Sequence, residues 1–454
     1  MVVSRSTETG QALWRELNRH RGVLSAADQG DLVLTLLYVC GVDPRSWKGF
    51  ADEPYVEPQD VELAVRSALP TDGNDLSELT RVIRQAAESR ELTPIIHSIR
   101  RCASEDVAFL FSDLLSRFAA AEGRKGGEFH TPKSIADLAV QLLEPLPSDR
   151  IFDPSCGTGS LLAAAVDDLL RRGHEVDRLS ISGSTFTTRS CRIAHMNVRL
   201  RNVVAKVSSD AGSLLQKGHP NDRYTLVVSN PPFNMSNWTR NRPSYSGWRY
   251  RPPPEHNANF AWLQYIVSSL DQGGRAAVVM TNGAGSSDNR QERDIRKAML
   301  HDGVVSAVIA LPPQLFPSTP IPVTLWLLRG PSAHRGDILF MDATTMGTMH
   351  ERTHRTLTES DIEAIGQAYT GWQLQSACEM PEFAASASLD RIAKAGYRLN
   401  PREYVASSNM ALSHAEAASV VGRLHGRLDE LQAQADQIDT VVARHLERIR
   451  LWTP

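Results

Sequence analysis

Hydrophobic and polar positions follow two different periods along this chain. Residues 1–120 are predicted to be helical, because the stretch 32–40 is apolar and the apolar positions of the stretch 107–118 recur at helical spacing. The proline-containing stretch 52–60 interrupts this region, so we expect two groups of helices separated by a loop. From about residue 126 to 345, short apolar runs alternate with helical segments, a pattern typical of parallel strands connected by helices.

The last part of the chain returns to the helical period. From residue 406 to 451 the apolar positions are alternately four and three apart, a spacing typical of a helix that packs along another helix. The positions in this stripe are Leu424, Leu428, Leu431, Ala435, Ile438, Val442 and Ile449, with His445 interrupting it. We therefore predict three domains: an all-helical N-terminal domain (1–120), a doubly wound, mostly parallel α/β domain (121–405) and a long C-terminal helix (406–454).

Two polar loops follow predicted strands and carry the candidate chemistry. The first is Asp153-Pro154-Ser155-Cys156-Gly157-Thr158-Gly159, which ends a strand and precedes an apolar helix beginning at Ser160. Gly157 and Gly159 allow a backbone to approach a ligand closely at a helix N-terminus. A dinucleotide fingerprint is absent, because Leu162 stands where its third glycine would be.

The second loop is Asn230-Pro231-Pro232-Phe233, directly after the apolar run 224–229. In this order the two loops resemble the cofactor loop and the catalytic loop of DNA adenine-N6 methyltransferases. The resemblance implies that the side-chain oxygen of Asn230 and the carbonyl of Pro231 each accept one hydrogen from the exocyclic amine of adenine. That frees the nitrogen lone pair for attack on a methyl sulfonium. Pro231 and Pro232 stiffen the loop, and Phe233 offers a ring face for a base removed from a duplex.

A third segment, Gly126-Gly127-Glu128-Phe129-His130-Thr131-Pro132-Lys133, precedes the first strand. By itself it predicts a helix with Thr131 as cap and Pro132 in the first position. Together with the two loops it resembles the modification subunits of type I restriction–modification systems, within the DNA adenine-N6 methyltransferases. The resemblance covers about residues 10–405 and includes the runs 257–264 (Asn-Ala-Asn-Phe-Ala-Trp-Leu-Gln) and 397–400 (Tyr-Arg-Leu-Asn).

The resemblance implies S-adenosyl-L-methionine as cofactor and assigns it a set of binding residues. These are Glu128, Phe129, His130, Thr131, Pro132, Lys133, Asp153, Gly157, Thr158, Gly159, Ser160, Thr185 and Asp210. It assigns the catalytic role to Asn230, Pro231, Pro232 and Phe233.

One position departs from the family pattern. Members usually have an acid after the second strand that binds both ribose hydroxyls, whereas this chain has Gly183-Ser184-Thr185 and no acid until Asp210. A hydroxyl gives a neutral hydrogen bond where a carboxylate gives a charge-assisted one, a loss on the order of 1–3 kcal/mol. We expect weakened cofactor binding, with complete loss as the alternative. Asp210 stands where the family has an acid near the adenine of the cofactor, and a turn cap is its alternative role.

The formal net charge of −3 changes the interpretation of DNA contact, because a domain that binds DNA alone is usually basic. Positive charge is instead concentrated in segment 238–251, where arginines alternate with aromatic residues. Its candidate DNA-binding residues are Arg240, Arg242, Trp248, Arg249 and Arg251. The alternative is a loop whose aromatic residues pack on their own domain. A second group, Arg189, Arg192, Arg199 and Arg201, is expected to be exposed.

Composition excludes several classes of protein. The 454 residues are 41% hydrophobic without a run of 18 apolar residues or a signal-peptide pattern, so we expect a cytoplasmic protein without membrane contact. Neither cysteines nor histidines have zinc-site spacing, and we predict no metal. The five cysteines are scattered, at positions 40, 102, 156, 191 and 378.

The sequence therefore predicts a modification subunit that methylates adenine N6 in duplex DNA after base flipping. The resemblance implies a separate specificity subunit and a second copy of the chain as partners, with a restriction subunit as a further candidate. Two alternatives stay open. One is a weakened or cofactor-free relative that binds DNA or partners in an anti-phage complex; the other is a protein-glutamine methyltransferase. The sequence gives neither the recognition site nor the stoichiometry.

Overall fold

The structure is a computed structural model whose residues divide into two compact units, 1–406 and 407–454. In the first unit it describes residues 2–19, 24–69, 76–102, 106–122, 130–217, 222–239, 247–316, 321–331, 336–351, 354–375, 379–380 and 383–405. In the second it describes residues 422, 425–426, 428–429, 431–433, 435–436 and 438–439.

The N-terminal part of the first unit is helical, as predicted. Its helices are α1 (Val2–Arg19), α2 (Ala26–Val42), α3 (Pro44–Ala51), α4 (Pro58–Ala68), α5 (Ser77–Glu88), α6 (Leu92–Cys102) and α7 (Val107–Glu122). The apolar stretch 32–40 is buried along α2, which lies at the centre of this group and contacts α3 to α7. The predicted break is confirmed, because α3 ends at Ala51 and α4 begins at Pro58.

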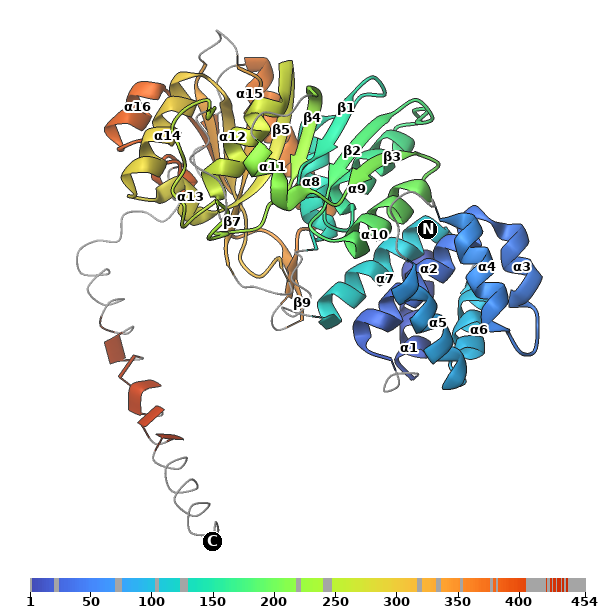
Figure 1. The fold of residues 1–454 in the computed structure, drawn as a ribbon. Coiled ribbons are helices and arrows are strands. Elements are labelled where there is room, and N and C mark those ends of the chain that lie inside the picture. The colour runs from blue at the N-terminus through green and yellow to red at the C-terminus, as the bar shows by residue number, and fades with distance from the viewer. Residues whose placement is uncertain are drawn as a thin grey trace. The chain divides into compact units, whose positions relative to one another are not determined.

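A ten-stranded sheet forms the rest of the unit, in the order β11-β12-β8-β6-β7-β5-β4-β1-β2-β3 (Figure 1). The strands are β1 (Arg150–Asp153), β2 (Ser180–Ser184), β3 (Ala205–Ser208), β4 (Tyr224–Ser229), β5 (Leu270–Thr281), β6 (Val305–Ala310), β7 (Val323–Arg329), β8 (Ile338–Asp342), β11 (Glu379–Met380) and β12 (Ala384–Ala387). All pairings within the run β5-β4-β1-β2-β3 are parallel. Strand β7 is antiparallel to both of its neighbours, β5 and β6. The predicted mostly parallel sheet is confirmed.

Helices cover both faces of the sheet. One face holds α8 (Lys133–Leu143), α9 (Ser160–Arg171), α10 (Thr188–Arg199) and α15 (Glu359–Gln375). The other holds α11 (Ala211–Lys217), α12 (Asn259–Ser269), α13 (Asn282–Ser286), α14 (Arg290–His301), α16 (Leu389–Lys394) and the 3₁₀ turn Pro401–Glu403. A separate hairpin consists of β9 (Thr348–Glu351) and β10 (His354–Thr356).

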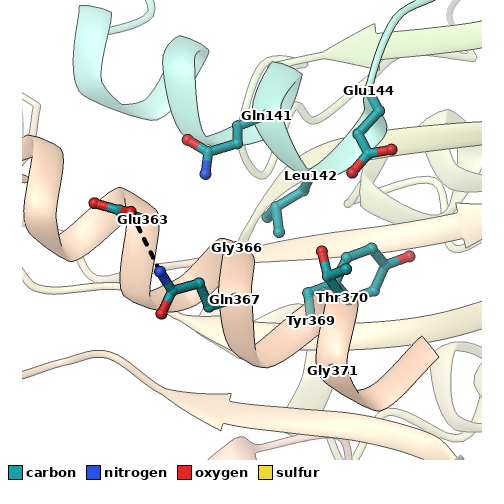
Figure 2. Close-up of a pocket in the computed structure, with 9 residues that line it drawn as sticks. All are labelled: Gln141, Leu142, Glu144, Glu363, Gly366, Gln367, Tyr369, Thr370 and Gly371. Atoms are coloured by element: carbon teal, nitrogen blue, oxygen red, sulfur yellow. Dashed lines mark hydrogen bonds between the residues drawn. The ribbon is translucent and has the colours of Figure 1, made fainter. Parts of the chain in front are cut away.

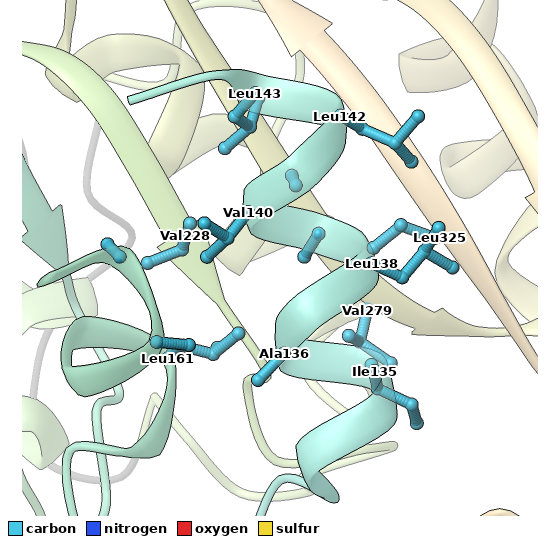
Figure 3. Packing of buried hydrophobic residues seen from close by; sticks show 14 of the residues in the cluster. Ile135, Ala136, Leu138, Val140, Leu142, Leu143, Leu161, Val228, Val279 and Leu325 are labelled. Atoms are coloured by element: carbon cyan, nitrogen blue, oxygen red, sulfur yellow. The ribbon is translucent and has the colours of Figure 1, made fainter. Parts of the chain in front are cut away.

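Helix α8 shows how the sheet core is built. Its residues Leu138 and Val140 lie over the strands with Val228, Val279 and Leu325, all of them buried (Figure 3). Neighbouring strand residues face the opposite side and belong to the second core, as with Val227 and Trp326. Burial on both faces explains why these strands are continuously apolar in sequence.

Helix α10 contributes to two cores, that of the N-terminal helices and that on the α8 side of the sheet. Ile193 and Met196 are buried among the N-terminal helices, whereas Ala194 and Val198 are buried against the sheet. The N-terminal helices therefore pack directly on the β3 end of the fold, beside α10 (Figure 1).

The described residues of the second unit are helical, in agreement with the predicted C-terminal helix. Within this unit Leu428, Leu431 and Ile438 are 60%, 49% and 63% exposed. Leu424, Val442, His445 and Ile449 lie outside the described residues.

Candidate functional site

The two candidate loops meet where the strand order of the sheet reverses. Strand β1 pairs with β2 on one side and with β4 on the other, so the loops that follow β1 and β4 are neighbours. Ser229, the last residue of β4, donates from Oγ to Asp153 Oδ1 at 2.9 Å, and the Ser155 amide donates to the same oxygen at 2.9 Å. The Ser229 bond joins the loop predicted to bind the cofactor, residues 153–160 and called the cofactor loop below, to the start of the predicted catalytic loop, residues 230–233.

Asp153 is buried at this junction. Its carboxyl is 1% exposed, and burial raises its pKa to about 7, although hydrogen bonds from Ser155 and Ser229 act in the opposite direction. Asp153 therefore links the two loops by accepting hydrogen bonds, and its pKa lies near neutral pH.

The glycines of the cofactor loop have the conformation expected of them. Gly157 and Gly159 have φ of 51° and 77°, and a Cβ on Gly159 would lie 3.1 Å from the Ala194 Cα on α10. Helix α9 begins directly afterwards at Ser160, and Gly159 provides no side-chain cap for its first amides. The loop thus places uncapped helix amides at the carboxyl edge of the sheet.

The side chain of Asn230 has a defined orientation. Its Nδ2 donates to Thr131 Oγ1 at 3.1 Å, while its Oδ1 is buried with no hydrogen-bond partner among the described residues. A buried carbonyl oxygen without a hydrogen-bond donor lowers the stability of the protein, and a bound donor would remove this cost.

Thr131 has a different role from the predicted helix cap. Helix α8 begins at Lys133 with Pro132 as its N-cap, and Thr131 does not cap it. The predicted cap and first helical residue are therefore wrong by one position, because the Thr131 hydroxyl is used by Asn230.

The residues after Asn230 are fixed by a contact that the sequence analysis missed. Asn234 has φ of 52°, and the carboxamide of Asn259 accepts from its amide and donates to its Oδ1, both at 3.0 Å. Phe233 contacts Phe316 edge to face, with ring centroids 6.0 Å apart. Asn259 lies in the run 257–264 quoted above, but nothing in its spacing indicated a paired carboxamide.

His130 joins the cofactor loop to the N-terminal helices. Its Nε2 lies 3.0 Å from Ser116 Oγ on α7, and its Nδ1 lies 3.3 Å from Thr158 Oγ1 and 3.2 Å from Ser160 Oγ. Burial lowers the pKa of His130 to about 4, so the ring is neutral near pH 7. Lys133, in contrast, is exposed and forms an ion pair with Asp137 in the next turn at 2.6 Å.

The departure at position 185 has a structural counterpart. Thr185 is fully buried, and its hydroxyl donates to the carbonyls of Thr187 and Ser208 at 3.0 and 3.3 Å. Asp210 lies just beyond β3 and accepts from Ser208 Oγ at 2.6 Å. The Thr185 hydroxyl is therefore used in bonds to the backbone. Asp210 is an acid at the carboxyl end of β3.

The arginine and aromatic segment packs on its own domain where it is described. Trp248 contacts Trp238 edge to face at 5.6 Å, and Arg249 pairs with Asp302 at 2.8 Å. Arg251 pairs with Asp294 at 3.4 Å. A DNA-binding role for this segment stays a prediction. Of the other predicted residues, Arg240, Arg242, Glu128 and Phe129 lie outside the described residues.

The second arginine group was predicted to be exposed, and for two of its members this is wrong. Arg192 and Arg201 are each 5% exposed. Arg192 pairs with Asp31 on α2 at 2.9 Å, and Arg201 pairs with Asp167 on α9 at 2.7 Å. Their charges hold helices together, which a helical wheel of α10 alone does not reveal.

A cavity of about 410 Å³ lies elsewhere, between α8 and α15 (Figure 2). Gln141 and Glu144 line it from α8 and the residue after it, and Glu363 and Gln367 line it from α15. The end of α8 precedes the start of β1, so this cavity lies at the amino edge of the sheet, away from both loops.

A doubly wound sheet with a glycine loop after β1 and Asn-Pro-Pro-Phe after β4 defines the class of DNA adenine-N6 methyltransferases. The chain belongs to the family described as N-6 DNA Methylase, whose model matches residues 104–412. The protein-glutamine alternative is thereby disfavoured.

Individual relatives agree with this family. The chain is 32% identical to the Type I restriction enzyme HindI methylase subunit of Haemophilus influenzae, over 76% of this chain and 78% of the relative. It is 31% identical to the MjaIX methylase subunit of Methanocaldococcus jannaschii, over 76% of this chain and 62% of the relative. The fold is similar to a type I methyltransferase subunit from Streptococcus thermophilus, with a TM-score of 0.69 and 21% identity over 88% of this chain and 99% of that one.

No helix among the described residues is both long and apolar enough to cross a lipid bilayer.

Proposed function

We propose that this chain transfers a methyl group from S-adenosyl-L-methionine to adenine N6 in duplex DNA, as the modification subunit of a restriction–modification complex. The observation that carries the proposal is the buried Oδ1 of Asn230, directly after β4, which has no hydrogen-bond partner among the residues that the structure describes. Thr131 occupies the amide nitrogen, so the oxygen is the side of the carboxamide that is presented to a donor.

The mechanism follows from that orientation. Asn230 Oδ1 and the Pro231 carbonyl accept the two N6 hydrogens, and the nitrogen lone pair becomes available for attack. Because Asn230 is only 5% exposed, an adenine stacked inside a duplex cannot reach it, which supports base flipping. Phe233, held edge to face by Phe316, provides a ring surface for the extruded base.

The residues present fit a bound S-adenosyl-L-methionine at its amino-acid end. The hydroxyls of Thr158 and Ser160 and the uncapped amides of α9 offer acceptors and donors for its ammonium and carboxylate groups. When bound, the cofactor supplies the electrophilic methyl group. The fit is poorer at the ribose, because the Thr185 hydroxyl already donates to the Thr187 carbonyl. Asp210 is the candidate acid near the adenine of the cofactor.

Partners are inferred from the relatives and from the C-terminal unit. We expect duplex DNA, a specificity subunit and a second copy of this chain, with a restriction subunit as a further candidate. The exposed Leu428, Leu431 and Ile438 are suited to packing against a helical partner.

The test is methyl transfer by the complex with its specificity subunit. Duplex DNA is incubated with S-adenosyl-L-methionine labelled in the methyl group, and the modified base is identified by mass spectrometry after digestion. Formation of N6-methyladenine supports the proposal. Cofactor binding of the wild-type complex is measured by calorimetry in parallel. A complex that binds DNA but neither binds the cofactor nor methylates adenine would instead support the cofactor-free alternative.

A further inference from the structure

Helix α7 reaches the cofactor loop through two chains of polar contacts. Ser112 and Ser116 lie one turn apart on this helix, which also packs against α1 and α2. Each serine begins one chain, and both chains end at Thr158 in the cofactor loop.

The first chain runs from Ser112 through Arg201 and Asn197. Arg201 Nη2 donates to Ser112 Oγ at 3.0 Å, and its Nη1 donates to Asn197 Oδ1 at 2.9 Å. Asn197 Nδ2 then donates to the Thr158 carbonyl at 3.1 Å. Asn197 and Arg201 are 1% and 5% exposed, so water does not compete well for these contacts.

The second chain runs from Ser116 through His130. Ser116 donates its own hydroxyl hydrogen to the Ser112 carbonyl at 3.0 Å, so its contact with His130 Nε2 requires the imidazole to be the donor. His130 Nδ1 is then an acceptor for the hydroxyls of Thr158 and Ser160. Both ring nitrogens are therefore engaged within the chain. The hydroxyls that point their hydrogens at His130 keep their lone pairs for a donor such as an ammonium group.

We propose that Ser112, Ser116, His130, Asn197 and Arg201 are positioning residues through which the N-terminal helices hold the cofactor loop in its binding conformation. The loop needs such support because Gly157 and Gly159 both have positive φ and gain freedom when released. The affinity for S-adenosyl-L-methionine thus depends on the packing of α7, and this part of the inference rests on the proposed function.

The test compares Ser116→Ala with Ser98→Ala in the full chain. Ser98 on α6 is a matched control, since it is buried and donates to the Pro94 carbonyl at 2.9 Å as Ser116 donates to Ser112. Ser116→Ala removes the hydrogen bond to His130 and should weaken the affinity for S-adenosyl-L-methionine, measured by calorimetry, about threefold to tenfold. The KM for the cofactor should rise while kcat at saturation changes little. Ser116→Thr, which keeps the hydroxyl, should restore binding.

A second measurement does not depend on cofactor use. Hydrogen exchange without ligand should be faster at the amides of residues 156–160 in Ser116→Ala than in Ser98→Ala, with similar thermal unfolding midpoints. Equal exchange in these two variants overturns the inference, and so does equal cofactor affinity when the wild type binds. If the wild type binds no cofactor but the loop exchanges faster in Ser116→Ala, the proposed function fails and the positioning role stands.

Discussion

At the scale of single residues, the chemistry of the site depends on which side-chain atoms already form hydrogen bonds within the protein. Asn230 has its nitrogen bonded to Thr131 and its oxygen unpaired among the described residues. Thr185 has its hydroxyl bonded to two carbonyls, and Asp210, the candidate acid near the adenine of the cofactor, accepts from Ser208. Residue type alone predicts neither arrangement.

Asn230→Ala removes the acceptor for the target amine. Methyl transfer should fall by on the order of 10²–10³-fold or more, because a preorganised contact to the reacting group is lost. Cofactor affinity should stay within a few-fold, since Asn230 is assigned to the base. Transfer of labelled methyl groups to DNA measures the first and calorimetry the second. The control is Asn18→Ala on α1, which deletes another carboxamide whose oxygen has no partner in the described part of the chain. Near wild-type transfer by Asn230→Ala would remove this residue from the mechanism.

Asp210→Asn should weaken cofactor binding by about tenfold, because a carboxylate makes charge-assisted hydrogen bonds to the cofactor and an amide makes only neutral ones. Thr185→Val should act differently, since its hydroxyl serves the carbonyls of Thr187 and Ser208. We expect a loss of about 1–3 kcal/mol in unfolding free energy with little change in affinity. Calorimetry and urea unfolding of both variants separate the two roles. The reverse pattern would assign the ribose contact to Thr185.

At the scale of elements, neighbouring strand ends and shared helices create the site. Asp153, the last residue of β1, and Tyr224, the first residue of β4, are 71 positions apart in sequence. The two strands nevertheless pair, and Ser229 bridges the loops that follow them. Helix α10 contributes to the core of the N-terminal helices and to the core on the α8 side of the sheet. Arg192 on α10 pairs with Asp31 on α2, and Arg201, just after α10, pairs with Asp167 on α9. The C-terminal helix belongs to a separate compact unit.

Truncation after Ser408 tests the proposed docking role of that helix. Because residues 1–406 form their own compact unit, the shortened chain should fold and bind the cofactor with unchanged affinity. It should no longer co-purify with the specificity subunit. The full-length comparison is the triple variant Leu428→Lys, Leu431→Lys and Ile438→Lys, which alters exposed positions only. This variant should no longer bind the specificity subunit, although its C-terminal residues are still present. Retention of the partner by both forms, or aggregation of the truncated one, would contradict docking.

At the scale of the whole molecule, two buried groups at the site make opposite contributions to stability as pH changes. Asp153 has its pKa raised from 3.8 to about 7, so between these values the folded chain binds the extra proton, and this contribution is lost as pH rises. His130 has its pKa lowered from 6.5 to about 4, so the unfolded chain binds the extra proton there, and stability is lost as pH falls.

Substituting Asp153 or His130 should leave the pH dependence of stability that comes from the other group. Between pH 4.5 and 6.5, Asp153→Asn should gain stability relative to the wild type as pH rises, by at most about 1.4 kcal/mol per pH unit. His130→Gln should gain relative to the wild type as pH falls. Urea unfolding across this range measures both differences. Parallel pH profiles for the three proteins would show that neither group titrates as described.

The sequence by itself determined the kinds of element and their order. Apolar periodicity predicted the helical start, the parallel strands and the C-terminal helix, because burial on one or two faces requires it. The glycines and Asn-Pro-Pro-Phe predicted the two loops, because their backbone requirements are local. Only the tertiary structure decided what Thr131, Thr185, Arg192 and Arg201 do, since each bonds to a partner distant in sequence or to a backbone atom that periodicity does not locate. The same holds for Asn259 and for the two chains from α7. A hydrogen bond depends on direction and distance between two atoms, and only folding fixes both.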